Sequence, residues 1–272
     1  MATLADSDTG TVRKTGLADL IDRWIYVFTA ALFLGAVLAG FVPASIGKIE
    51  AVRAGMRAPF PVLLHVHAVL MGSWILMLLT QTVLMATGRR TGHTQLGITA
   101  FIIAPALVTV GFFLVPTMAL QFADGIRHAP PAVAAELRPV FQGFVVDIML
   151  VQIRVGLLFA ALIALALWAR RRDAGLHKRL MILGTATAIP AATDRIPWLP
   201  TTLPDSPLTT DLWPLALLAP MFLWDLYRLR RIHKAWVIYL LSCLALAVPI
   251  HLLWDTPLWR ETALRILGVS GV

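Results

Sequence analysis

The sequence has only one cysteine and few charged residues. Its 272 residues include a single cysteine, Cys243, which excludes an internal disulfide and a cysteine-based metal or cluster site. Without a Cys-x-x-Cys-His motif, a c-type haem is excluded as well. Only 14% of the residues are charged and 58% are hydrophobic, too few charges to cover that much apolar surface in water. These shortages exclude a soluble globular enzyme, a disordered chain and a disulfide-rich scaffold.

Common motifs of catalysis and nucleotide binding are missing too. The sequence contains no Gly-x-Ser-x-Gly elbow for a nucleophilic serine and no His-Glu-x-x-His zinc motif. It contains neither a P-loop nor a Gly-x-Gly-x-x-Gly unit. The last long apolar run has no lysine, so a retinal Schiff base is not expected there. The sequence therefore identifies no catalytic residue.

Long apolar runs are what the sequence has in abundance. About 20 mostly apolar residues suffice for a transmembrane helix, and the mean hydropathy of the chain is +0.79. We predict an all-α, polytopic transmembrane helix bundle of about seven spans, at residues 24–43, 62–87, 95–120, 140–168, 180–196, 212–224 and 235–254. The fifth span is rich in small and hydroxyl residues and the sixth is short, so these two are the weakest.

The spans define one membrane domain. We expect it to cover residues 24–256, between a polar segment at residues 1–23 and a short tail at residues 257–272. The longest polar connections are expected at residues 44–61, 121–139 and 197–211. Because the first 20 residues are polar, no cleavable signal peptide is expected.

Basic residues are spread unevenly over the predicted loops. The chain has 23 Lys and Arg against 15 Asp and Glu. With the N-terminus inside, 14 basic residues fall on the inner side and 8 on the outer side, while Arg154 lies within a span. The positive-inside rule therefore predicts an N-in, C-out protein, in a bacterial cytoplasmic membrane. The excess of Lys and Arg then indicates how the chain is oriented in a lipid bilayer, and no nucleic-acid partner is expected.

Three predicted inner loops share one arrangement, an arginine pair followed by a histidine at the start of the next span. They are Arg89-Arg90 with His93, Arg171-Arg172 with His177, and Arg230-Arg231 with His233. This weak repeat would place three imidazoles at one depth, where they could contact a cofactor, a quinone head or lipid phosphates. The alternative is that the arginines are ordinary stop-transfer charges and the histidines are interfacial residues.

Ionisable residues inside a span are costly, so they usually face the bundle or a cavity. Asp147 and Arg154 are seven residues apart in the fourth span, on one helix face and about 10 Å apart along the axis. Each is therefore expected to have a partner on another helix. We predict an outer polar cluster from His65, His67, Asp147, Asp194, Arg195 and His251.

Within this cluster, the expected ion pairs are Asp147 with Arg195 and Asp194 with Arg154. His65 and His67 point in different directions on their helix, and His67 is slightly favoured because its stripe also carries Gln81. On the inner side, Asp225 is expected to pair with a nearby arginine or histidine. The alternative for all these residues is interhelical bonding that only fixes the packing of the bundle.

Histidines on different helices at matched depth suit bis-imidazole ligation of haem b. The candidate ligands are His67, His93, His177, His233 and His251. The sequence thus predicts a protein that binds haem or quinone for electron transfer or oxidase assembly. The alternatives are a transporter or lipid-handling protein, suggested by Asp147, Arg154 and the prolines inside spans, and a non-catalytic accessory subunit with a membrane-protein partner.

Three pieces of the chain show a resemblance. The pattern His67, Trp74, Gln81, Arg89-Arg90 and His93-Thr-Gln-Leu-Gly97 resembles one seen in uncharacterised bacterial multi-pass membrane proteins. The elements His177-Lys178-Arg179-Leu180-Met181 and Asp225 to His233 are similar to two further elements of that group. Thr94 departs from the pattern, which has arginine there. The group is similar in outline to b-type transmembrane cytochromes, and this resemblance implies His93, His177 and His233, with His67, as ligands.

Overall fold

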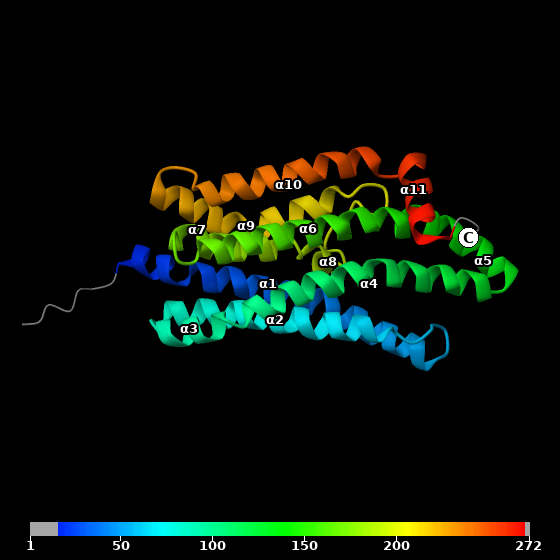
Figure 1. Cartoon of the computed structure of the whole chain (residues 1–272), viewed down its shortest axis with the longest axis horizontal. Helices are drawn as coiled ribbons and strands as arrows, with labels where there is room; N and C mark the ends of the chain where they lie inside the picture. Colours follow the sequence, from blue (N-terminus) through cyan, green and yellow to red (C-terminus); the bar gives the residue numbers. More distant parts are fainter. Residues whose placement is uncertain (1–15, 270–272) are drawn as a thin grey trace, which may run out of the picture.

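The protein is an elongated bundle of helices that run back and forth along one axis (Figure 1). A computed structural model describes residues 16–269, and every regular element within that range is a helix. The elements are α1 (Leu17–Arg53), α2 (Val62–Ala86), α3 (Arg90–Gly97), α4 (Ala100–His128), α5 (Pro131–Val140), the π-helix η1 (Phe141–Val145), α6 (Val146–Ala169), α7 (Ala174–Ala186), α8 (Pro190–Thr193), α9 (Leu208–Leu229), α10 (Lys234–Leu253) and α11 (Pro257–Leu267).

Five stretches of helix in the described part are long and apolar enough to cross a membrane. They are α1, α2, α3 with α4, α5 with α6, and α10. Their surfaces carry exposed apolar side chains such as Val69, Phe113 and Leu241. In water these side chains would have no partner, whereas a bilayer covers them. The chain is therefore an integral membrane protein.

The predicted fifth and sixth spans correspond to α7 with α8 and to α9. Helix α7 has only 13 residues, and after a turn at residues 187–189 the four-residue α8 follows. Helix α9 has 22 residues, about 33 Å by the α-helical rise, but it carries Asp211, Asp225 and two internal prolines. The fifth and sixth predicted spans, which the sequence marks as weakest, are thus the two that do not correspond to any of the five long apolar stretches.

Helix extends well beyond the apolar runs. Helix α1 continues through Pro43 to Arg53, and α4 with α5 fills most of residues 121–139. The predicted loops at residues 44–61 and 121–139 are therefore wrong over most of their length. Good helix formers carry each helix past its apolar segment, and hydropathy does not detect that extension. The predicted tail likewise contains α11, whose Leu267 packs in a cluster with Phe141.

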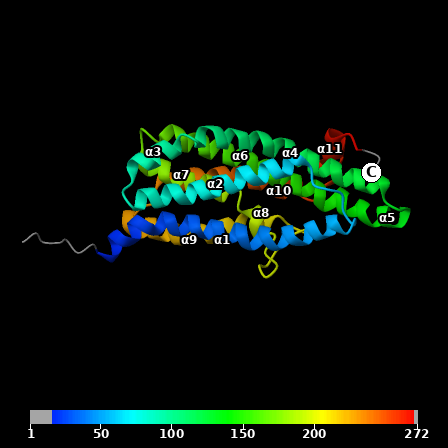
Figure 2. The same cartoon turned by 90° about the horizontal axis from the view of Figure 1, so that it is seen from below.

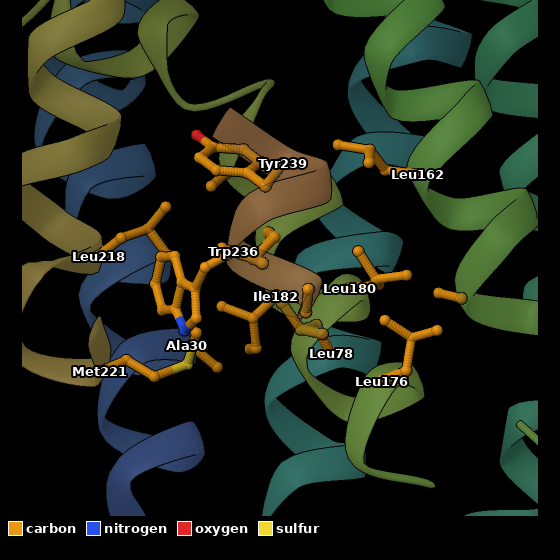
Figure 3. Packing of buried hydrophobic residues seen from close by; sticks show 14 of the residues in the cluster. Ala30, Leu78, Leu162, Leu176, Leu180, Ile182, Leu218, Met221, Trp236 and Tyr239 are labelled. Atoms are coloured by element: carbon orange, nitrogen blue, oxygen red, sulfur yellow. The ribbon is translucent and has the colours of Figure 1, made fainter. Parts of the chain in front are cut away.

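The largest buried cluster surrounds α7. Leu180 and Leu183 are fully buried there, among side chains from α1, α6, α9 and α10. Figure 3 shows Trp236 and Tyr239 of α10 beside this helix. Because other helices cover α7, its small and hydroxyl residues lie at helix interfaces, where they allow close packing, and do not face lipid. The hydroxyl of Thr185, for example, is buried and accepts a hydrogen bond from the indole of Trp74 (3.0 Å).

Small residues allow two close approaches in this region. A Cβ at Gly184 of α7 would lie 2.8 Å from Cδ1 of Ile163 on α6. A Cβ at Gly40 of α1 would overlap the carbonyl group of Ala192 in α8. Gly40 is therefore required, because the atoms that a Cβ would meet there are backbone, whereas a Cβ at Gly184 would force the side chain of Ile163 to shift.

The two ends of the bundle differ. The turns at residues 87–89, 170–173 and 230–233 all lie at the end where α1 begins (Figures 1 and 2). We call this the basic end, because each turn carries an arginine cluster. The α1–α2 connection, α5 and α11 form the opposite end, which we call the far end. The three Arg-pair and histidine elements of the sequence therefore share one end of the molecule.

Candidate functional site

A charged network lies toward the far end, centred on Arg154 of α6. Nη1 of Arg154 donates to Oδ1 of Asp211 on α9, and Nη2 donates to Oγ1 of Thr210 (3.0 Å). Nε2 of His251 on α10 donates to the other carboxylate oxygen of Asp211 (2.8 Å). We call Arg154, Thr210, Asp211 and His251 the far-end network. It joins three helices through one carboxylate.

The far-end network is buried at one side and open at the other. The side chain of Arg154 is 5% exposed, whereas those of Asp211 and His251 are 23% and 33% exposed. Arg154 lies about 22 Å along α6 from Ala169 at the basic end, within a bilayer core of about 30 Å. The imidazole of His251 is therefore the most exposed side chain of a network whose arginine is enclosed.

Asp194, which follows α8, is a neighbour of the far-end network. It lies near enough to Arg154 for the two charges to attract. Its Oδ1 atom is buried and makes no hydrogen bond to any described residue. The predicted pair of Asp194 with Arg154 is therefore wrong as a direct contact, because Asp211 occupies that place.

The second predicted pair, Asp147 with Arg195, is also wrong. Asp147 is buried and accepts a hydrogen bond from the backbone N–H of Asp255 (3.2 Å), next to α11. The guanidinium of Arg195 lies over the ring of Phe41, 4.8 Å from its centroid. Asp147 and Arg154 share α6 but have separate surroundings, because the return of α9 and the fold of α11 supply a different partner to each.

A second buried ion pair lies toward the basic end. Arg179 of α7 donates from Nε and Nη2 to the two carboxylate oxygens of Asp225 on α9 (both 2.6 Å). Nη1 of Arg179 donates to the carbonyl of Gly175 (3.0 Å), and the indole of Trp236 donates to Asp225 (2.8 Å). The two charged side chains are 7% and 8% exposed. We call this the basic-end pair; Asp225 thus has the arginine partner that the sequence suggested.

An apolar layer separates the two charged groups. Leu218 and Met221 of α9 lie between Asp211 and Asp225 along the helix and are fully buried. In Figure 3 the indole nitrogen of Trp236 and the hydroxyl of Tyr239 point in opposite directions beside this layer. The network and the pair therefore lie on opposite sides of this apolar layer.

The imidazoles at the basic end have distinct bonding states. Nδ1 of His177 donates to the carbonyl of Ala166 (2.8 Å), which leaves Nε2 as the acceptor. His93 bonds to the backbone of Gln81, while its Nδ1 is buried without a partner among the described residues. His93 and His177 lie near enough for their charges to interact. Each ring is thus held by a backbone carbonyl, and its other nitrogen has no hydrogen bond to a described residue.

His233 is different, because its ring caps a helix. Its Nδ1 accepts a hydrogen bond from the backbone N–H of Ala235 (3.1 Å) at the start of α10. In the neutral ring the proton is then on Nε2, which cannot ligate a metal without losing it. His233 also lies against Gly175, where a Cβ would be 3.5 Å from Nε2. Burial, with the nearby Arg179, lowers the pKa of His233, which keeps it neutral.

The remaining predicted ligands are separated. His67 of α2 is half-buried beside Gly111 of α4, with Nδ1 unbonded to any described residue, whereas His65 is exposed. Helices α2 and α10 lie on opposite edges of the bundle in Figure 1, so His67 and His251 are not brought together. Gln81 lies on α2 beside Gly97 of α3. Within residues 16–269, no group of three or more His, Cys, Asp or Glu residues is arranged to hold a metal ion.

Asp211 and Thr210 were not predicted as site residues. They precede the apolar run that starts at Leu212, and that run predicts an outer loop before it. A signal was present: Arg154 needs a carboxylate at its own depth, and Asp211 is an acidic residue in the first turn of the helix that follows.

Comparison with known proteins gives no relative. Protein-family models, curated proteins and solved structures contain no match to this chain. The function therefore has to be inferred from the geometry of the bundle.

Proposed function

We propose that this integral membrane protein is a transporter that binds protons, and a small anion with them, at the far-end network. One observation carries this proposal: Asp211 bridges the buried Arg154 and the partly exposed His251. Arg154 and Asp211 alone would neutralise each other, so packing does not require the third ionisable group. Histidine is the side chain that ordinarily changes charge between pH 5 and 8.

Protonation changes the charge of the network. With neutral His251 the charges of Arg154 and Asp211 cancel, and a proton on His251 adds one positive charge. In a low-dielectric site this charge attracts an anion, so proton and anion binding are linked. The broken α7–α8 segment beside the network is the kind of interrupted helix found around transporter sites.

Proton flux into liposomes tests this proposal. Vesicles that contain the full chain and trapped pyranine receive a pH step, and the dye reports internal pH. We expect His251→Gln to reduce the flux at least about tenfold, as for loss of a group in a proton relay. His65→Gln is the matched control, because His65 is exposed on α2 and lies outside the network. Wild-type flux equal to that of empty vesicles, or unchanged flux in His251→Gln, contradicts the proposal.

We also propose that the chain crosses a bacterial cytoplasmic membrane seven times, with an N-in, C-out orientation. It is supported by the path of the chain, which returns along the bundle through α7–α8 and again through α9 (Figure 1). The carboxylates of α9 are paired inside the bundle, which reduces the cost of placing that helix in lipid. A C-terminal reporter that is active only in the cytoplasm tests the orientation: activity of the fusion would contradict C-out.

A second candidate is haem or quinone binding at His93 and His177, in electron transfer or oxidase assembly. The supporting observation is that a backbone carbonyl holds each ring while its other nitrogen has no hydrogen bond to a described residue, as second-shell partners hold metal-ligating histidines. A bound haem would supply one-electron redox chemistry. The resemblance to b-type transmembrane cytochromes favours the same residues. His233 does not fit as a ligand, because its Nδ1 caps α10.

A reduced-minus-oxidised spectrum tests the second candidate. Protein purified from a haem-sufficient host should show Soret and α bands that are lost in His93→Ala and His177→Ala. His233→Ala should keep both bands. Absence of the bands in the wild type contradicts haem binding, and co-purification of a stoichiometric protein would instead favour an accessory subunit.

A further inference from the structure

A cavity of about 400 Å³ lies at the basic end, between α1, α7 and α9. Its lining includes Asp22 and Tyr26 of α1, Lys178 of α7, and Trp224 and Arg228 of α9. The basic-end pair forms part of its wall. The cavity is distinct from the far-end network, which lies beyond the apolar layer of Leu218 and Met221.

Most charges in the wall of the cavity neutralise each other. Asp22 accepts hydrogen bonds from Nη2 of Arg228 (2.6 Å) and from the indole of Trp224 (2.8 Å). Asp225 is fully engaged by Arg179. Lys178 has no ion-pair partner among the described residues, and its ammonium lies over the ring of Tyr26, 4.7 Å from the centroid. The wall therefore has one uncompensated positive charge.

The position of the cavity favours a ligand at the membrane surface. Arg228 precedes the arginine-rich turn at residues 230–233, and Trp224 and Tyr26 are residue types that concentrate at membrane–water boundaries. Arg228 donates to Asp22 through Nε and Nη2, which leaves Nη1 as a further donor, and Lys178 lines the same cavity. An ammonium and a guanidinium N–H in the wall of one cavity suit the oxygens of a phosphate.

We propose that this cavity binds one phosphate monoanion, from an anionic lipid headgroup or a soluble organic phosphate. Lys178 neutralises the bound charge and Arg228 donates a hydrogen bond to it. The ion pairs of Asp22 and Asp225 keep the wall from holding a second anion. Trp224 and Tyr26 cover the apolar part of the ligand next to the phosphate.

Lipid retention measured by native mass spectrometry tests this site. The full chain is placed in phosphatidylcholine nanodiscs with a small share of phosphatidylglycerol, and the phosphatidylglycerol that stays bound is counted after release. We expect Lys178→Gln to bind about fivefold more weakly than wild type, the effect of one cation near a membrane surface. Lys178→Arg should restore binding.

The matched control is Lys234→Gln, at the same end of the bundle but paired with Asp173 outside the cavity. It should retain phosphatidylglycerol as wild type does. Competition by soluble glycerophosphoglycerol, a phosphodiester monoanion like the lipid headgroup, identifies a soluble source, and its absence identifies the lipid. Equal retention in Lys178→Gln and wild type, or no preference of the wild type for either phosphate over phosphatidylcholine, overturns the proposal. Matching thermal unfolding of the lysine variants excludes a folding defect as the cause.

Discussion

The two Arg–Asp pairs of this bundle have the same chemistry but different surroundings. Both carboxylates lie on α9, 14 residues and about 21 Å apart on nearly the same helix face. Asp225 is enclosed by Arg179 and Trp236, so its oxygens are occupied on all sides. Asp211 faces the enclosed Arg154 on one side and the partly exposed His251 on the other. A closed pair holds helices together, whereas the open network also presents the partly exposed imidazole of His251.

Both pairs make it possible for α9 to lie in the bundle. An unpartnered carboxylate inside a membrane protein costs several kcal/mol, and removal of one member of a buried pair typically costs about 3–5 kcal/mol. The comparison therefore predicts that loss of either arginine destabilises the fold, more at the closed pair than at the open network.

The largest effect is expected from Arg179→Met. It leaves Asp225 buried with only the indole of Trp236, so we expect the free energy of unfolding in detergent to fall by about 3–5 kcal/mol. The double variant Arg179→Met with Asp225→Leu should recover most of this loss, because no charge is then buried. A double variant as unstable as the single one would contradict a structural role for the pair.

A smaller effect is expected from Arg154→Met. Asp211 keeps its bond to His251 and is partly exposed, so the loss should be about 2–3 kcal/mol, measured by the same unfolding experiment. If Arg154→Met proved as damaging as Arg179→Met, the far-end network would be as closed as the basic-end pair and the contrast between them would fail.

Trp236→Phe tests the third member of the closed pair, the indole that donates to Asp225. It removes one hydrogen bond to the Asp225 carboxylate while keeping an aromatic ring, so a loss of about 1.5–3 kcal/mol is expected if the bond is fully formed. Proton flux into liposomes should remain at the wild-type level, because Trp236 belongs to the closed pair. Reduced flux at unchanged protein yield would connect the two regions.

The smallest effect is expected at Asp173, in the turn at residues 170–173 of the basic end. Hydrogen bonds from Lys234 and from the backbone N–H of Leu176 lower the pKa of Asp173. A carboxyl with a lowered pKa stabilises the fold above its unfolded value of about 3.9 and loses that contribution as the pH falls through the lowered value. Thermal unfolding of Asp173→Asn should therefore depend less on acid pH than that of wild type, and identical profiles would contradict this.

The sequence was sufficient for the class of protein and for some of its buried residues. Hydropathy located the apolar core of α1, α2, α4, α6 and α10, and the rarity of charge inside spans singled out Asp147 and Arg154. Their partners were not predictable, because pairing depends on how α9 and α11 return against α6. Asp211 shows the limit: its depth depends on where α9 begins, which the local residues do not specify.

The order of the charges along the chain has a consequence for biogenesis. Arg154 is made 57 residues before Asp211, and Arg179 is made 46 residues before Asp225. At about 5–20 residues per second, each arginine waits roughly 2–11 seconds for its counter-charge. During that interval α6 and α7 carry unpaired arginines, whose transfer into lipid costs free energy. The insertion machinery or bound water therefore has to solvate them. Synthesis of α9 ends that interval, because Asp211 and Asp225 then supply the counter-charges for both arginines.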